Sequence, residues 1–253
     1  MNAFLIALWT TAALAGPVKL KSADGTALGA IESGTGTKGV VLVHGEGKSA
    51  ADWQSVAGRL AGNGFHVLAI DLRGSGTSPL SAAATDTDWA RMPDDVVAAA
   101  AWLRGKGATE VTLIGAETGG AVAVAAAAAD PAVVSVTIVS PAVTAHGLKI
   151  TDALTAYGKR PLLLVAASGD TLASKAAGLL EPRALGPKLL RLSEGKSSGV
   201  SLFVTDPDLD AVVVGWLNGS WKGEEGPRST AASVKAPELG PIDTKGSKLG
   251  ETP

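Results

Sequence analysis

The strongest constraint on the fold is residues 111–129, which predict a strand, a sharp turn and a helix in direct succession. Residues 111–114, Val-Thr-Leu-Ile, are typical of a buried strand. Residues 121–129 contain only alanine and valine, and alanine favours helix while occupying little space. The turn between them needs residues without bulk, which Gly115 and Gly119 supply. The stretch therefore predicts a helix packed closely against a sheet.

The rest of the chain alternates in the same way. An Asp-Gly turn at 24–25 predicts a hairpin between 18–20 and 27–32. Further buried strands are predicted at 40–43, 65–71, 133–139, 161–166 and 189–192. Helices are predicted at 50–61, at 94–104 with Asp94 as the N-cap, and at 207–217 with Asp206 as the N-cap. Strands alternating with helices indicate an α/β fold with a doubly wound, mostly parallel sheet and helices on both faces.

The two ends of the chain differ from this pattern. Residues 3–15 are apolar apart from two threonines and end in Ala-Leu-Ala, which is typical of a secretory signal peptide at 1–15 and predicts export. The alternative is that this run is an N-terminal strand of the fold. Residues 222–253 are rich in proline, glycine and charge, which predicts a disordered tail. One domain is then expected at 16–221.

Composition excludes several classes of function. The formal net charge of -2 argues against a nucleic-acid surface, and the absence of cysteine excludes thiolate nucleophiles and cysteine-ligated metals. The apolar run at 3–15 is too short to cross a hydrocarbon core of about 30 Å, so no transmembrane segment is expected. We assign no cofactor and no oligomeric state, and a small-molecule ligand in a cleft remains the expected partner.

Five segments in order carry a resemblance to a known family. They are Val-Leu-Val-His-Gly at 41–45, Leu-Ala-Ile-Asp-Leu-Arg-Gly-Ser-Gly at 68–76, Gly-Ala-Glu-Thr-Gly at 115–119, Val-Ser-Pro at 139–141 and Pro-Leu-Leu-Leu-Val-Ala-Ala-Ser-Gly-Asp at 161–170. Together the segments resemble the α/β-hydrolase superfamily, in its esterase and dienelactone-hydrolase-like branch without a large lid. The 115–119 segment has the spacing of the family's nucleophile elbow, Gly-x-Ser-x-Gly.

The resemblance implies a catalytic triad of nucleophile, acid and histidine. Asp170 stands where the family has its acid, but Glu117 stands at the nucleophile position and Ser198 where the histidine is expected. Two of the three positions therefore depart from the family. We interpret the chain as an α/β-hydrolase-fold protein that has lost serine-hydrolase activity and keeps a binding role. The alternative is an active hydrolase with Glu117 as a carboxylate nucleophile, for which His146 would be the base.

The resemblance also implies an oxyanion hole formed by the backbone N–H of Thr118 and one from Gly45 or Glu46. A carboxylate at Glu46 would oppose a developing negative charge there. We expect the Glu117 carboxylate to occupy this hole itself, by accepting those N–H groups. We assign no metal, although Glu46, Glu117 and Asp170 could converge to bind Ca²⁺ or Mg²⁺ as an alternative.

Overall fold

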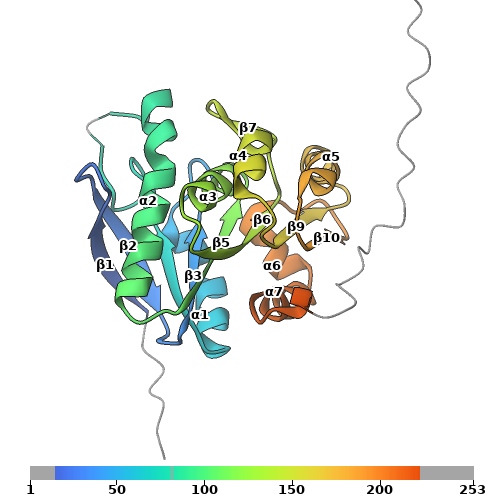
Figure 1. Cartoon of the computed structure of the whole chain (residues 1–253), viewed down its shortest axis with the longest axis horizontal. Helices are drawn as coiled ribbons and strands as arrows, with labels where there is room; N and C mark the ends of the chain where they lie inside the picture. The colour runs from blue at the N-terminus through green and yellow to red at the C-terminus, as the bar shows by residue number, and fades with distance from the viewer. Residues whose placement is uncertain (1–14, 81, 223–253) are drawn as a thin grey trace, which may run out of the picture.

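A single eight-stranded sheet organises the computed structural model, which describes residues 15–80 and 82–222 (Figure 1). The strands are β1 Gly16–Lys21, β2 Ala27–Ser33, β3 Lys38–Val43, β4 Phe65–Ile70, β5 Glu110–Ala116, β6 Val133–Val139, β9 Leu162–Ala167 and β10 Lys188–Ser193. Their order across the sheet is β1-β2-β4-β3-β5-β6-β9-β10. The β1–β2 and β2–β4 pairs are antiparallel and all others are parallel. The predicted signal peptide and tail lie outside the described residues, apart from the boundary residues Ala15 and Lys222.

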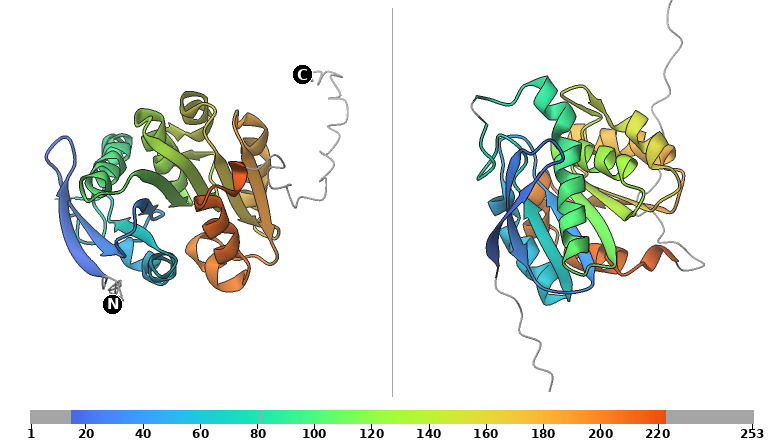
Figure 2. Two further views of the ribbon diagram at one scale, coloured as in Figure 1. Left: turned by 60° about the horizontal axis from the view of Figure 1, so that its bottom comes forward. Right: turned by 60° about the vertical axis from the view of Figure 1, so that its left-hand side comes forward.

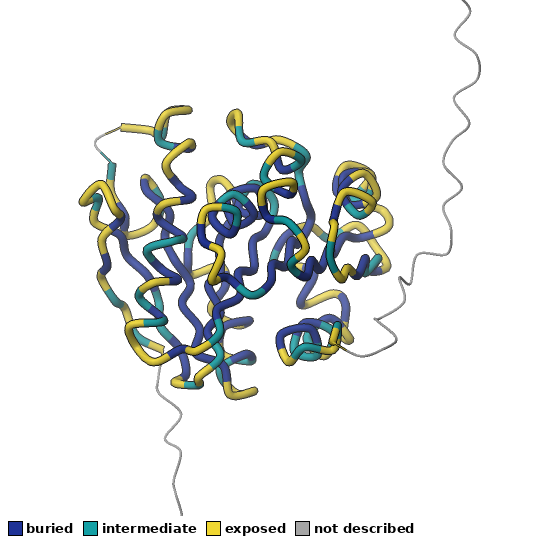
Figure 3. Tube along the Cα trace, viewed as in Figure 1, coloured by how far each residue is buried: buried dark blue, intermediate teal, exposed yellow. Residues whose placement is uncertain are grey.

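Helices cover both faces of the sheet, as Figure 2 shows. They are α1 Gln54–Gly62, α2 Asp86–Gly105, α3 Thr118–Ala129, α4 Ile150–Tyr157, α5 Thr171–Leu180, α6 Leu202–Thr205 and α7 Leu209–Leu217. Four of them, α2 to α5, share one apolar core with the sheet, and α1, α6 and α7 share the other. The inner strands β3, β4, β5, β6 and β9 are almost wholly buried between these layers, whereas the edge strand β1 is largely exposed (Figure 3). The predicted α/β fold is confirmed. None of the described helices has the length and apolarity that crossing a bilayer requires.

Helix α2 begins eight residues before the predicted start at Asp94. Thr85 caps it, because its hydroxyl accepts the N–H of Asp88 while the Asp88 carboxylate accepts the N–H of Thr85. Trp89 and Met92 are buried in the core, which stabilises the first two turns. Burial and capping together outweigh the cost of Pro93 inside the helix.

Helix α7 begins at Leu209, two residues after the predicted start. Asp206 does not cap it, because its buried carboxylate accepts hydrogen bonds from the guanidinium of Arg191 at 3.0 Å and from the Ser193 hydroxyl at 2.5 Å. Burial is the largest single effect on the pKa of Asp206 and acts to raise it, but the hydrogen bonds from Ser193, Arg191 and the Asp208 N–H and the charge of Arg191 together lower it. Asp208 stands at the N-cap position but makes no side-chain capping hydrogen bond, so the prediction of an aspartate cap on α7 is wrong.

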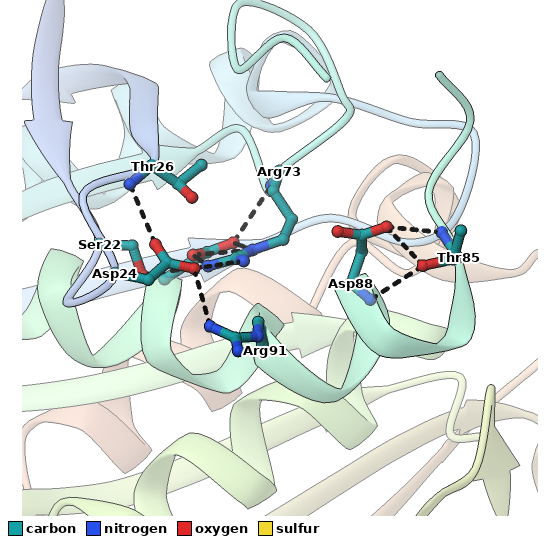
Figure 4. Close-up of polar contacts among 8 residues, drawn as sticks. Ser22, Asp24, Thr26, Arg73, Thr85, Asp88 and Arg91 are labelled. Carbon is teal, nitrogen blue, oxygen red and sulfur yellow. Dashed lines mark hydrogen bonds and ion pairs between the residues drawn. The ribbon is translucent and has the colours of Figure 1, made fainter. Parts of the chain in front are cut away.

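A buried ion-pair network joins the N-terminal hairpin to α2 (Figure 4). Arg73 donates to both carboxylate oxygens of Asp95, at 2.5 and 2.9 Å, and both side chains are almost fully buried. The same guanidinium contacts Asp24 at 2.8 Å and the hydroxyl of Ser22 at 3.2 Å. Hydrogen bonds from Arg73 lower the pKa of Asp24. The network therefore joins three segments that are distant in sequence: the turn after β1, the loop after β4 and helix α2.

Replacing Asp95 with asparagine should destabilise the fold by about 3–5 kcal/mol, because Arg73 would remain buried without its bidentate partner. Asp24→Asn is the matched control and should cost about 1 kcal/mol or less, because that carboxylate is partly exposed and Arg73 keeps Asp95. Urea unfolding of the two variants at pH 7 measures the difference. Equal losses in the two variants would contradict the assignment of Asp95 as the principal partner.

Candidate active site

Strand β5 and helix α3 meet at Glu117 in a sharp turn, as the sequence predicted. Glu117 has φ 54° and ψ −122°, a conformation that a non-glycine residue rarely adopts. The turn is held because the Glu117 N–H donates to the Val139 carbonyl at 2.8 Å and the Glu117 carbonyl accepts the N–H of Gly120 at 3.0 Å. The turn therefore presents the Glu117 side chain at the carboxyl end of the sheet, where the family places its nucleophile.

The elbow glycines are required by close backbone contact. A β-carbon on Gly115 would lie 2.4 Å from the Gly119 carbonyl oxygen, and one on Gly119 would lie 2.2 Å from the His44 carbonyl oxygen. A β-carbon on Gly120 would lie 2.4 Å from the Ile138 side chain. Any side chain at these positions would separate α3 from the sheet or from the loop after β3 Lys38–Val43.

The structure brings Glu117 and Ser198 together. The Ser198 hydroxyl donates to Oε1 of Glu117 at 3.1 Å. The other carboxylate oxygen packs against the loop after β3, since a β-carbon on Gly45 would lie 2.5 Å from Oε2. The elbow carboxylate is thus held between the two loops that the family uses for its oxyanion hole and its histidine.

Asp170, the position of the family's acid, directly precedes helix α5. Its carboxylate accepts the N–H of Ala173 at 3.1 Å and so caps that helix. It lines the same cleft as Glu117 and Ser198. The three triad-equivalent positions therefore share one site, although the described hydrogen bonds link Glu117 to Ser198 and leave Asp170 on its own helix.

The expectation that the Glu117 carboxylate accepts the N–H of Glu46 is wrong. The Glu46 N–H donates to the Thr118 hydroxyl at 2.7 Å. Among the described residues, the carboxylate of Glu117 accepts its hydrogen bond from Ser198 instead. The Thr118 hydroxyl, rather than the elbow carboxylate, is therefore the acceptor for the Glu46 N–H.

The side chain of Glu46 does not enter the hole either, because His146 engages it. Nε2 of His146 lies 3.0 Å from Oε2 of Glu46, Nδ1 lies 3.5 Å from Asp86, and the ring stacks on Trp89 at a centroid distance of 4.2 Å. The hydrogen bond to Glu46 raises the pKa of His146, with Asp86 adding to the effect against a smaller opposing effect of burial. His146 lies in the turn between two short antiparallel strands, β7 Thr144–Ala145 and β8 Leu148–Lys149, and links this hairpin to α2 and to the loop after β3.

The other two histidines are committed elsewhere. His44 is buried, its Nε2 accepts the N–H of Leu72 at 3.1 Å, and its Nδ1 lies 2.7 Å from the Gly45 carbonyl. Burial lowers its pKa, which is consistent with a neutral ring that uses one nitrogen as acceptor and one as donor. His66 lies in β4 and contacts Glu32 at 2.7 Å.

Two clefts meet at Glu117 and Ser198, which line both. The first, the α1 cleft, has a volume of about 360 Å³ and is lined by side chains of helix α1 and by residues from the segment 198–204. The second, the α5 cleft, has a volume of about 730 Å³ and is bounded by residues 140–144 and α5. A small molecule in either cleft would reach the elbow carboxylate.

Sequence reasoning missed two features of this site. Ser140 adopts φ 52°, is buried, and its hydroxyl accepts the N–H of Gly199 at 2.9 Å, which fixes the loop that carries Ser198. The Ser-Pro pair that follows a strong strand is the signal that could have pointed to it. Helix α5 was also missed, although Asp170 followed by residues of high helix propensity would have predicted it.

The cation alternative is not supported. In the part of the chain that the structure describes, no group of three or more histidine, cysteine, aspartate or glutamate side chains is arranged to hold a metal ion. Glu46 is instead engaged by His146, and Asp170 caps α5. Convergence of Glu46, Glu117 and Asp170 on one ion would require those contacts to be broken.

Gly119→Ala should destabilise the protein by about 1–3 kcal/mol, because its methyl group would overlap the His44 carbonyl. Gly178→Ala is the matched control, since Gly178 is also helical but a β-carbon there meets nothing within 4 Å. The control should gain up to about 1 kcal/mol from helix propensity. Denaturant unfolding measures the change in the free energy of unfolding for both variants. A Gly119→Ala variant as stable as the wild type would contradict the close-contact argument.

The His146 imidazole should titrate above the usual value near 6.5 in the native protein, and Glu46→Gln should bring its pKa down. A raised native pKa means that the His146 contacts stabilise the fold below the unfolded-state pKa and lose that effect as pH rises through the native value. An NMR titration of the imidazole carbon-bound protons measures both pKa values. His66 is the internal reference, and an unchanged His146 pKa in Glu46→Gln would exclude Glu46 as the cause.

Comparison with known proteins agrees with this geometry. Residues 36–161 match the family described as serine aminopeptidase, S33. This segment contains the oxyanion loop and the elbow, and it ends before Asp170 and Ser198. No curated protein sequence matches the chain.

Solved structures resemble most of the chain. An esterase of Pyrococcus furiosus superposes with a TM-score of 0.69 at 18% identity, covering 81% of this chain and 92% of that one. Dienelactone hydrolase of Anabaena variabilis superposes with a TM-score of 0.65 at 20% identity, covering 81% and 97%. An esterase of Exiguobacterium antarcticum gives a TM-score of 0.62 at 17% identity, covering 79% and 99%. With the elbow, the strand order and the matching family segment, these likenesses show that the chain has the α/β-hydrolase fold.

Proposed function

We propose that this protein has lost the serine-hydrolase chemistry of its superfamily and uses its clefts to bind a small-molecule ligand. The observation that carries the proposal is the partner of the elbow side chain. Glu117 is hydrogen-bonded by the hydroxyl of Ser198, at the place where a nucleophile and a histidine would meet. Neither partner has the chemistry of the residue that it replaces.

The chemical argument has two parts. A serine hydroxyl is far too weak a base to take a proton near neutral pH, so Ser198 cannot activate a nucleophile or a water molecule. Loss of triad members costs a serine hydrolase on the order of 10⁴ to 10⁶ in turnover. Two such losses in one site leave only positioning and the backbone donors.

No histidine is placed to compensate. The chain has three, and all three are described: His44 is buried with both nitrogens engaged, His66 contacts Glu32, and His146 contacts Glu46. A histidine serving Glu117 would have to leave one of these partners. This argues against a general base for water at the elbow.

The second candidate is a hydrolase with Glu117 as a carboxylate nucleophile. It is favoured by one observation, the retention of the elbow conformation at Glu117. An ester formed on Glu117 would need a base to direct water onto it. His146 would have to leave Glu46 and Asp86 to provide that base. The activity assay below separates the two candidates.

We also propose that the protein is exported, with residues 1–15 removed as a signal peptide. The proposal is supported by the apolar run and the Ala-Leu-Ala ending. Cleavage after Ala15 would leave β1 whole, since that strand begins at Gly16.

The wild-type protein should hydrolyse short acyl esters such as 4-nitrophenyl acetate no faster than Glu117→Ala does. The double variant Glu117→Ser with Ser198→His should gain measurable activity, because the elbow, Asp170 and the backbone donors remain. Steady-state kinetics on purified protein at pH 7 measures both results.

The control is the double variant with Asp170→Asn added, which keeps the helix cap but weakens support for the introduced histidine. Any activity gained should fall in this triple variant. Wild-type turnover that disappears in Glu117→Ala would overturn the proposal and favour the carboxylate-nucleophile enzyme.

A further inference from the structure

The α5 cleft has an apolar wall that solvent reaches. Leu172 and Leu179 lie seven residues apart on α5, which places them on one face of the helix, and both line the cleft. Their exposed fractions are 84% and 52%. Pro141 and Val143 line the same cleft from the loop after β6. Large aliphatic side chains left this open along a cavity provide a surface for an apolar ligand.

The end of the cleft next to the elbow carries negative charge. Glu117 and Asp170 line it there, and among residues 15–80 and 82–222 neither forms an ion pair with a basic side chain. Glu46 also lines the cleft, but His146 engages it. The described lining contains one basic residue, Lys175. A half-buried carboxylate without a cationic partner is better stabilised when a cation is brought to it.

We propose that the α5 cleft binds an amphipathic organic cation, a protonated amine carried on a hydrocarbon body. The ammonium group lies at the Glu117 carboxylate on the side of Asp170, and the hydrocarbon body lies along Leu172 and Leu179. The inference rests on the proposed ligand-binding function and names its ligand class. It also gives the glutamate at the elbow a positive role, as the counter-charge of the ligand.

Two other ligand classes fit the cleft less well. A hard metal ion needs several oxygen ligands, and the described residues offer no such group. A ligand carboxylate or fatty acid would bring a negative charge against Glu117 and Asp170, which costs free energy in a partly desolvated site. Carboxylates that have no basic partner within residues 15–80 and 82–222, together with an apolar wall, select for a cation with an apolar body.

The test compares three probes of the same length: hexylammonium, hexanoate and 1-hexanol. Isothermal titration calorimetry and NMR chemical-shift mapping on the full chain at pH 7 measure dissociation constants and the residues affected. Hexylammonium should bind at least about 10-fold more tightly than hexanoate, a difference of about 1.4 kcal/mol. The shifts should fall on α5 and residues 140–144.

Glu117→Gln should remove most of this preference, because the amide keeps the shape of the side chain and loses the charge. Leu172→Ala should weaken the binding of all three probes, because it removes part of the apolar wall of the cleft. Leu185→Ala is the matched control, since Leu185 is an exposed leucine that does not line the cleft, and it should leave binding unchanged. Circular dichroism melting of each variant verifies that it folds.

Equal or tighter binding of hexanoate would overturn the proposal, as would an undiminished preference for hexylammonium in Glu117→Gln. An equal effect of Leu172→Ala and Leu185→Ala would place binding outside the cleft and would also overturn it. Calcium chloride at millimolar concentration should not displace hexylammonium, and displacement would favour a metal site instead. Ester turnover tests the proposed loss of hydrolase activity, and binding of the three probes tests the proposed ligand class. Either proposal can therefore fail while the other holds.

Discussion

The close approach of α3 to β5 and to the loop after β3 is the constraint on which the site depends. Gly119 lies against the His44 carbonyl, and Gly115 lies against the first turn of α3. The chain must reverse between the strand and the helix within one residue, and that residue takes positive φ. Glu117 is this residue, and its strained conformation is imposed by the surrounding packing rather than by its own chemistry.

It follows that the fold and the catalytic chemistry can be separated. The packing that forms the elbow uses glycines and backbone carbonyls and does not depend on the chemistry of the side chain at position 117. A carboxylate is also stabilised there, because Glu117 is the N-cap of a 12-residue helix whose N-terminus favours negative charge. A glutamate at the elbow therefore preserves the architecture of the α/β-hydrolase fold while standing where the family's motif has serine.

Sequence reasoning recovered the elements whose signal is local. Strand β6 was predicted with its observed bounds, and the elbow with its glycines, because apolar runs and glycine spacing reflect the packing directly. The start of α2 was missed because burial of Trp89 and Met92 outweighs Pro93, which is a tertiary effect. The order of the family segments predicted that Glu117 and Ser198 share one site, and the two side chains are hydrogen-bonded. The sequence did not predict that Thr118 accepts the Glu46 N–H, because that contact depends on side-chain conformation. No pattern in a single sequence encodes that choice.

The sign of the electrostatic potential at the elbow connects these observations. A serine hydrolase presents backbone donors to a developing negative charge, so its site must attract anionic oxygen. In this protein the loop N–H of Glu46 is occupied by Thr118, and the elbow carries a carboxylate without a basic partner among the described residues. On the proposed reading, such a site would repel the oxyanion that ester hydrolysis forms and would attract a cation instead. In the function proposed here, the glutamate that replaces the serine of the elbow also reverses the charge of the species that the site stabilises. The proposed loss of hydrolysis and the proposed binding of a cation would then both follow from one residue.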